Sequence, residues 1–402
     1  MIYWLFAFTI AVLACVTAVI YKKNLNLWLG HFLRRKLAGK WHQYGQSDSL
    51  THVMLCFVDH YEPQWGKDIS LEQERARVDR WLYDYPQVAS KFQDADGHPP
   101  KHSFFYPEEE YRQEHLDKIA YICAQGYGEI EVHLHHHDDT SDNLRTTLER
   151  FTETLHENHG AFCRNPSSGK LEYAFIHGNW CLNNSRPDGK LCGVNDELII
   201  LKETGCFADL TFPSAPSDTQ PAFANEIYYA KDNPGKPNSH NTGIPVERNG
   251  SSWGDLMIIT GPLALNWRRL KKKIFPQIEN SDIRGNMPPS ADRIDLWVNT
   301  QISVKNKEDW LFIKIHTHGT QEESMDTLLG KPFVDMCEYL DNKYNDGKKY
   351  KLHYVSAREM YNIIKAAEAD VQGEPGDYRD FIIPKPEYKV ADIFKEELKH
   401  KA

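Results

Sequence analysis

The sequence has no excess of basic residues and no paired cysteines. Its 47 Lys and Arg are outnumbered by 57 Asp and Glu, for a formal net charge of −10. Because binding to a phosphate backbone needs a concentrated positive surface, we expect no nucleic-acid partner. Of the eight cysteines, only Cys15 lies in the first 21 residues, and the others form no Cys-x-x-Cys pair. Neither a disulfide framework nor a zinc ribbon is therefore predicted.

Low-complexity sequence is also missing. Hydrophobic residues make up 41% of the chain, which excludes a mostly disordered protein, and 24 glycines with 21 prolines exclude a collagen-like repeat. A chain of 402 residues has room for one large domain and appendages.

Charged side chains are absent from residues 1–21, and a helix of that length spans roughly 30 Å of hydrocarbon. A cleaved signal peptide would have a basic start and a shorter apolar run. The sequence therefore predicts an uncleaved, single-span membrane anchor over 1–21, followed by a basic juxtamembrane segment over 22–49. Basic residues follow the span and none precedes it, which favours a cytoplasmic location for the rest of the chain, with the opposite orientation still open.

From residue 50, short apolar runs alternate with segments of helical periodicity. Strand-like runs such as Glu129–His135 and Trp310–His316 are separated by helical stretches, which indicates βαβ units and a parallel sheet. Seven or eight such units predict an α/β fold, a (β/α) barrel over residues 50–368. An open doubly wound sheet would carry a glycine-rich turn after its first strand, and none follows Asp59.

Two further segments have a different composition. Residues 213–254 are rich in Pro, Asn, Gly and Ser, which predicts a loop insertion over one face of the barrel. Residues 369–402 contain Gly-Glu-Pro-Gly and Pro-Lys-Pro, which predicts a tail that wraps the surface rather than a domain.

Three predicted strands end in acidic and imidazole side chains. The first ends in Asp59-His60-Tyr61-Glu62, and a late strand ends in His316-Thr317-His318. The strongest pattern is Glu129-Ile-Glu-Val-His133-Leu-His135-His136-His137, where a turn after His135 would return His137 toward His133. Because the carboxyl ends of parallel strands meet at one edge, we expect these side chains to share one metal or proton-transfer site.

The same residues resemble motifs of the polysaccharide deacetylase family, over roughly residues 50–320. His133-x-x-x-His137 resembles that family's metal-binding motif, Asp59 falls where its first strand ends in an acidic pair, and His316 or His318 falls at its late Leu-x-His motif. Gly205-Cys-Phe-Ala-Asp209 is similar to a further segment, which makes Asp209 a candidate substrate-binding residue.

The resemblance implies a hydrolase that removes N-acetyl or related acyl groups from an amino-sugar polymer or a lipid-linked glycan. It also implies that the (β/α) barrel is distorted, and that one divalent metal ion, zinc or alternatively cobalt, manganese or nickel, is held by an Asp and two His. An acidic base would activate a water molecule, and His316 or His318 would protonate the leaving amine.

Two departures from the family pattern leave roles open. Its Asp-Asp pair is Asp59-His60 here, so either Asp59 binds the metal and Glu62 is the base, or Asp59 is the base and His60 binds the metal. Its arginine motif is replaced by Phe175–Trp180, where His177 would orient a base. Candidate aromatic contacts to sugar rings are Tyr61, Trp65, Tyr106 and Trp180.

Two other functions compete with the deacetylase. His133-Leu-His135 also matches the His-x-His pair of barrel metallohydrolases such as amidohydrolases and phosphoesterases, although that pair usually lies on the first strand. The missing second Asp and the missing Arg are compatible with a catalytically inactive, glycan-binding member of the family.

Overall fold

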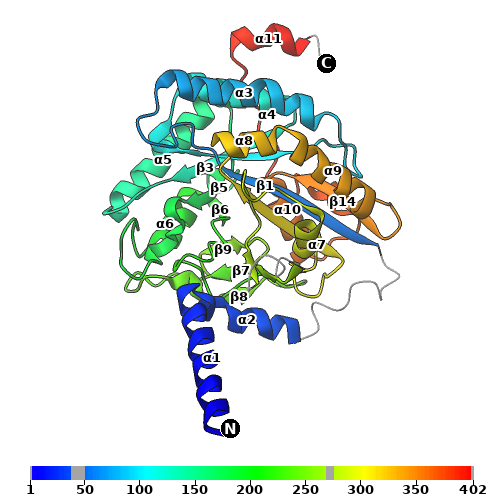
Figure 1. Ribbon diagram of the computed structural model, residues 1–402. Helices are drawn as coiled ribbons and strands as arrows, with labels where there is room; N and C mark the ends of the chain where they lie inside the picture. Colours follow the sequence, from blue (N-terminus) through cyan, green and yellow to red (C-terminus); the bar gives the residue numbers. More distant parts are fainter. Residues whose placement is uncertain (1, 38–49, 269–275, 400–402) are drawn as a thin grey trace.

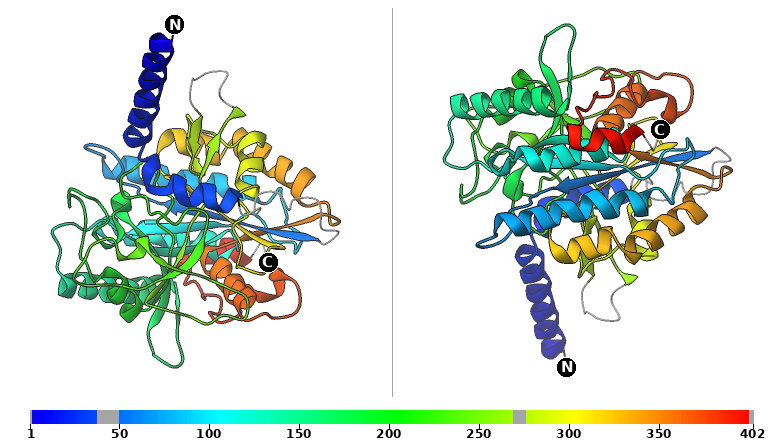
Figure 2. Two further views of the ribbon diagram at one scale, coloured as in Figure 1. Left: turned by 90° about the horizontal axis from the view of Figure 1, so that it is seen from below. Right: turned by 90° about the horizontal axis from the view of Figure 1, so that it is seen from above.

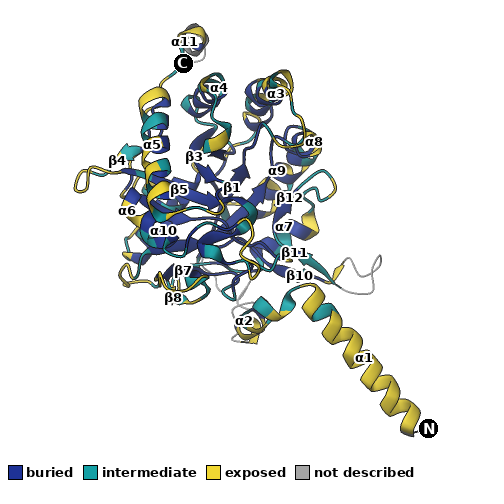
Figure 3. Ribbon diagram, turned by 90° about the vertical axis from the view of Figure 1, so that its left-hand side faces the viewer, coloured by how far each residue is buried: buried dark blue, intermediate teal, exposed yellow. Residues whose placement is uncertain are grey.

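A computed structural model describes residues 2–37, 50–268 and 276–399 of the chain (Figure 1). Of the predicted basic juxtamembrane segment 22–49, residues 38–49 lie outside the described residues. The predicted apolar helix is present as α1 (Ile2–Lys22), which is long and apolar enough to cross a membrane. Its side chains are exposed along nearly its whole length, and it projects away from the rest of the chain (Figure 3).

Helix α2 (Leu25–Leu37) attaches this projecting helix to the domain. Trp28 is fully buried and Phe32 is 4% exposed, in a small core that includes Ala215 and Leu263. The guanidinium of Arg35 pairs with Glu226 beneath these rings. This apolar face therefore docks α2 on the domain, and Asn24 just before it donates a hydrogen bond of 2.9 Å to the carbonyl oxygen of Pro216.

The domain is built on one sheet of twelve strands, most of them parallel. The strands are β1 (Thr51–His60), β2 (His102–Pro107), β3 (Gly128–Leu134), β4 (Cys163–Arg164), β5 (Leu171–His177), β6 (Cys206–Asp209), β7 (Ile227–Ala230), β8 (Gly243–Pro245), β9 (Leu256–Ile259), β12 (Asp282–Ile283), β13 (Trp310–Thr317) and β14 (Tyr350–Val355). A separate hairpin pairs β10 (Ala264–Asn266) with β11 (Gln277–Glu279).

Helices lie on both sides of this sheet (Figure 2). After α2 the described residues form the helices α3 (Leu71–Ala89), α4 (Gln113–Ala124), α5 (Ser141–His159), α6 (Glu197–Thr204), α7 (Ala291–Val298), α8 (Glu322–Leu328), α9 (Lys331–Tyr344), α10 (Ala357–Glu368) and α11 (Asp392–Lys399). Helix α11 lies at the opposite end of the molecule from α1 (Figure 1). Its residue Phe394 stacks on Tyr121 with ring centroids 4.8 Å apart, so the C-terminal tail packs on α4.

The prediction of a closed barrel is wrong. The strand order is β12-β13-β1-β2-β3-β5-β6-β9-β7-β8, and among the described residues the two end strands, β12 and β8, do not pair with each other. Strands β7 and β8, which lie within the predicted loop insertion 213–254, form an antiparallel pair where another parallel strand would be needed to continue a barrel. Strand β14 pairs with the first half of β1 beside β2, so it does not extend the sheet either.

Strand β1 shows how the sheet separates two faces. Side chains alternate along a strand, and Val53, Leu55 and Phe57 join the core formed with α3, α4 and α9. Met54, Cys56 and Val58 join the second core, which is formed with α10. A strand buried on both faces by helices explains its nearly continuous apolar sequence.

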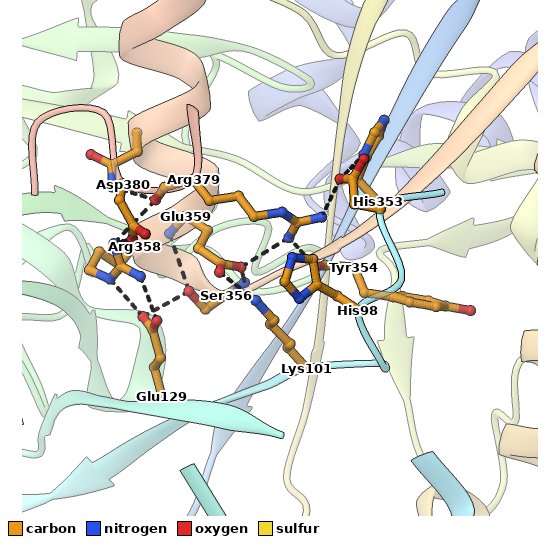
Figure 4. A network of polar contacts seen from close by, with 12 residues as sticks. His98, Lys101, Glu129, His353, Tyr354, Ser356, Arg358, Glu359, Arg379 and Asp380 are labelled. Carbon is orange, nitrogen blue, oxygen red and sulfur yellow. Dashed lines mark hydrogen bonds and ion pairs between the residues drawn. The ribbon is translucent and has the colours of Figure 1, made fainter. Parts of the chain in front are cut away.

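A buried ionic network connects α10, β3 and the C-terminal tail (Figure 4). Arg358 binds Glu129 through two contacts, of 2.7 and 3.0 Å. Glu359 pairs with Lys101 and accepts a hydrogen bond of 3.2 Å from Arg379 of the tail. Burial alone would raise the pKa of Glu359, but the positive charges of Lys101, Arg379 and Arg358 outweigh burial and lower it to about 2.

We predict that Glu359→Gln destabilises the protein by about 3 kcal/mol, because it leaves Lys101 buried without its counter-charge. An unfolded Glu titrates near pH ~4.3, above the folded-state pKa of Glu359. The stabilising contribution is therefore complete above that pH and is lost as the pH falls toward about 2.

Urea unfolding of the detergent-solubilised chain from pH 7 downward measures this effect. Wild type should lose stability more steeply than Glu359→Gln below pH ~4.3, and exposed Glu157→Gln is the matched control. Equal stability of Glu359→Gln and wild type at pH 7 would contradict the prediction.

Candidate metal centre

Three strand ends meet at one edge of the sheet, as the sequence predicts. The ring centroid of His60, the last residue of β1, lies 4.8 Å from that of His133 on β3. The His60 ring also stacks on His318, just beyond β13, with centroids 4.7 Å apart. These imidazoles share the sheet face that carries α10, because β1 and β13 present their even-numbered side chains there.

The carboxylate of Glu62 lies among these imidazoles. Its Oε1 is 3.2 Å from Nε2 of both His133 and His135, and its Oε2 is 3.0 Å from Nδ1 of His318. Burial alone would raise the pKa of Glu62, but the hydrogen bonds from His133, His135 and His318 outweigh it and hold the pKa well below its usual range. The group is therefore an ionised carboxylate at neutral pH.

His60, Glu62 and His133 could hold a metal ion, since one ligand atom from each lies within 4.8 Å of the others. His133 Nδ1 contacts the carbonyl oxygen of Ile176 at 2.9 Å, and that oxygen can only accept a hydrogen bond. Nδ1 therefore donates to that carbonyl, and Nε2 is the nitrogen that faces Glu62 and would bind an ion. This arrangement is typical of metal-binding histidines, whose other nitrogen donates to a carbonyl or carboxylate.

Asp59, the predicted metal ligand or base, lies on the other face of the sheet. Its Oδ2 is 2.7 Å from Nε2 of His102, and its Oδ1 accepts a hydrogen bond of 2.6 Å from the amide of Gly319. A Cβ atom on Gly319 would lie 2.0 Å from Asp59 Oδ2, so only glycine permits this approach. Asp59 and His60 are neighbours on a strand and point in opposite directions, hence they cannot share one ion.

His137 does not return toward His133. The chain leaves the site at Asp138, which has a φ of 48°, and the His137 side chain is 61% exposed beside Asp138. His135 takes the place predicted for His137, because it lies on the same face of the chain as His133 and contacts Glu62. Its Nδ1 is 2.5 Å from Glu109.

His318 and His316 have different surroundings. His318 contacts Glu62. Burial alone would lower the pKa of His318, but the hydrogen bond and the charge of Glu62 outweigh burial and raise it. His316 lies deeper, with Nε2 4.0 Å from Asp282, and burial holds its pKa well below the usual value, helped by the charge of Lys314. Of the two predicted acids, His318 is therefore the one that lies in the cluster.

Two of the four candidate aromatic residues flank this cluster. The His318 ring centroid lies 5.6 Å from that of Trp65 and 6.3 Å from that of Trp180. Trp65 is 48% exposed and Trp180 is partly exposed, so both can contact a bound molecule. Tyr61 and Tyr106 are fully buried in the core on the other face, which removes them as substrate contacts.

The two other candidate substrate-binding residues are enclosed. Asp209 is fully buried and bonded to Thr211, and burial raises its pKa to about 7. His177 is also fully buried and faces Glu197 of α6, away from Glu62. Glu197 was missed by the sequence analysis, because a Glu in the first turn of a helix is ordinarily exposed and nothing in the sequence shows that this one is buried.

We predict that His133→Ala lowers the affinity of this cluster for zinc and that His137→Ala does not, because only His133 lies among the candidate ligands. The expected loss exceeds about 100-fold, since changes to residues that merely orient ligands already cost about 10–100-fold. Competition of the purified chain with a chromogenic zinc chelator measures it. Asp59→Asn should behave like His137→Ala, and a loss of zinc affinity in His137→Ala equal to that in His133→Ala would contradict the assignment.

Comparison of the sequence with protein-family models gave no match, and comparison with curated proteins gave none either. The function is therefore argued from the geometry of the site.

Proposed function

We propose that the protein is a metal-dependent hydrolase that removes acetyl groups from an N-acetylated amino sugar, in a glycan polymer or a lipid-linked glycan. The observation that carries this proposal is the Glu62 carboxylate surrounded by His60, His133, His135 and His318 at a sheet edge flanked by two partly exposed tryptophans. The resemblance of the strand ends to the polysaccharide deacetylase motifs supports the choice of reaction.

His60, Glu62 and His133 would hold the metal ion, because their ligand atoms converge and the His133 Nδ1 proton is fixed on a backbone carbonyl. A ligand set of two imidazoles and one carboxylate suits zinc, and also cobalt, manganese or nickel. A divalent cation supplies Lewis acidity, which polarises a carbonyl oxygen and makes water a better nucleophile at neutral pH.

The remaining side chains would move protons. Burial alone would lower the pKa of His135, but its hydrogen bonds to Glu109 and Glu62 raise it to about 10, so the ring is an imidazolium at neutral pH. Its 30% exposed side chain would stabilise the negative charge that develops on the acetyl oxygen, and Glu109 beside it would accept the proton as water adds to the acetyl carbonyl carbon. His318 would donate a proton to the sugar nitrogen as the carbon–nitrogen bond breaks, which releases acetate and an amine. Trp65 and Trp180 would contact the faces of sugar rings, since aromatic rings present large apolar surfaces.

We expect the purified full chain, supplied with zinc, cobalt, manganese or nickel, to release acetate from N-acetylglucosamine oligosaccharides. His318→Gln should lower kcat by about 100- to 10,000-fold, the usual contribution of a general acid, while its metal content stays unchanged. His137→Ala is the matched control and should keep wild-type activity.

Acetate and free amine are measured together, so that each bond broken is counted twice. Hydrolysis of aryl phosphates without release of acetate would replace the deacetylase with another metallohydrolase. Metal binding with no hydrolysis of either substrate class would favour a glycan-binding protein without catalysis.

We further propose that α1 is an uncleaved membrane anchor and that the domain faces the cytoplasm. Basic residues follow the span closely, and the positively charged side of a span stays in the cytoplasm. Helix α2, docked through Trp28, would hold the domain close to the membrane, which suits a lipid-linked intermediate on the inner leaflet better than an external polymer.

Reporter fusions at the C-terminus test this orientation. We expect a fluorescent protein fused there to fluoresce and an alkaline phosphatase fused there to be inactive, since the phosphatase needs an oxidising compartment. The opposite pair of results would place the domain outside and would make an external glycan the substrate.

A further inference from the structure

A second group of imidazole and carboxylate side chains lies beside the first and is more deeply buried. His136 follows β3, His177 ends β5 and Glu197 begins α6. Glu197 Oε1 lies 3.1 Å from Nε2 of His136 and 3.6 Å from Nε2 of His177. His177 and Glu197 are fully buried and His136 is 9% exposed. One ligand atom from each lies within 4.8 Å of the other two.

The proton positions on these rings leave both inner nitrogens facing one carboxylate. His177 Nδ1 donates to the carbonyl oxygen of Gly178, which can only accept, so in the neutral ring Nε2 carries a lone pair. That Nε2 is buried and has no hydrogen-bond partner among the described residues. His136 Nδ1 contacts Asp139 Oδ2 at 3.0 Å and its Nε2 lies 3.1 Å from Glu197 Oε1, a contact that needs either a proton or a cation between the two atoms.

The surroundings hold these rings in place and leave another imidazole unpaired. A Cβ atom on Gly193 would lie 2.0 Å from the His136 ring, so the backbone at this position presses directly on that ring. His240 is fully buried on Phe212, and neither of its ring nitrogens has a hydrogen-bond partner among the described residues. Burial lowers the pKa of His240 to about 3; the charge of Glu197 opposes this shift and that of His177 adds to it.

We propose that His136, His177 and Glu197 bind a second divalent ion of the zinc class, at a site separate from the candidate metal centre at Glu62. Two imidazole nitrogens and one carboxylate oxygen form a common zinc donor set. Asp139 and the Gly178 carbonyl would fix the ring orientations, as outer partners do in zinc sites. The ion would link the ends of β3 and β5 to the start of α6, on the sheet face opposite α10.

The competing arrangement places an extra proton on His136 in place of the ion. An imidazolium there would bridge Asp139 and Glu197, but it would still leave His177 Nε2 buried without a partner. A buried polar atom without a partner destabilises the folded chain, because it has lost its hydrogen bonds to water. A cation removes this cost, since it uses both inner nitrogens and Glu197 at once.

Metal counting on the full chain, produced in zinc-supplemented medium and purified in detergent, tests the proposal. We expect two zinc ions per wild-type chain, and one per chain in Glu197→Gln and in His177→Ala. His133→Ala should retain the ion at Glu197 and lose the other, so failure of the proposed catalytic site and failure of this second site give different counts. His115→Ala, which removes a buried histidine paired with Glu74, is the matched control and should keep two.

A measurement on the wild-type chain guards against variants that fail to fold. Crystals grown with zinc should show anomalous scattering at the zinc edge between His136, His177 and Glu197. Scattering at that point supports the proposal, and its absence from ordered crystals overturns it. Two zinc ions retained by folded Glu197→Gln and His177→Ala would also overturn it.

Discussion

The ionised Glu62 carboxylate is the interaction on which the candidate metal centre depends. It is 2% exposed, and its two oxygens contact three imidazoles from β3 and from the end of β13. A buried carboxylate costs several kcal/mol unless opposite charge or hydrogen bonds compensate, so these histidines are as necessary to the fold as they are to any chemistry. Three strand ends are thereby held at one point, and a cation there would replace protons that the metal-free rings must otherwise carry.

The end of β3 and the residues just after it contribute side chains to both clusters, because successive side chains point to opposite faces. His133 and His135 turn toward Glu62, whereas His136 turns toward Glu197 on the opposite face of the sheet. A change in the position of β3 would therefore move both clusters together. Two buried carboxylates on opposite sides of a single strand end also restrict that end, since each must keep its imidazole partners.

The positions of the main strands and the edge where chemistry gathers could be predicted from the sequence. The expected strand Trp310–His316 is observed as β13, and three strand ends meet where parallel strands must place them. Sheet closure could not be predicted, because it depends on the pairing of the short strands β7 and β8 within a segment whose composition is typical of a loop. An apolar strand pattern fits a barrel and an open sheet covered by helices equally well.

The errors within the site have a common cause. Period-two alternation, applied to Asp59 and His60, already excludes a shared ion, and applied from His133 it selects His135 over His137. The family motifs selected Asp59 and His137 by their spacing in the sequence. The alternation of side chains along the strands instead places His60 and His135 in the cluster. The roles of Glu197 and His102 could not be predicted from the sequence, because each side chain pairs with a residue distant in the chain. Glu197 contacts His136, and His102 contacts Asp59. Local pattern thus identifies the edge of the sheet, while the partner of each buried charge is set by tertiary packing.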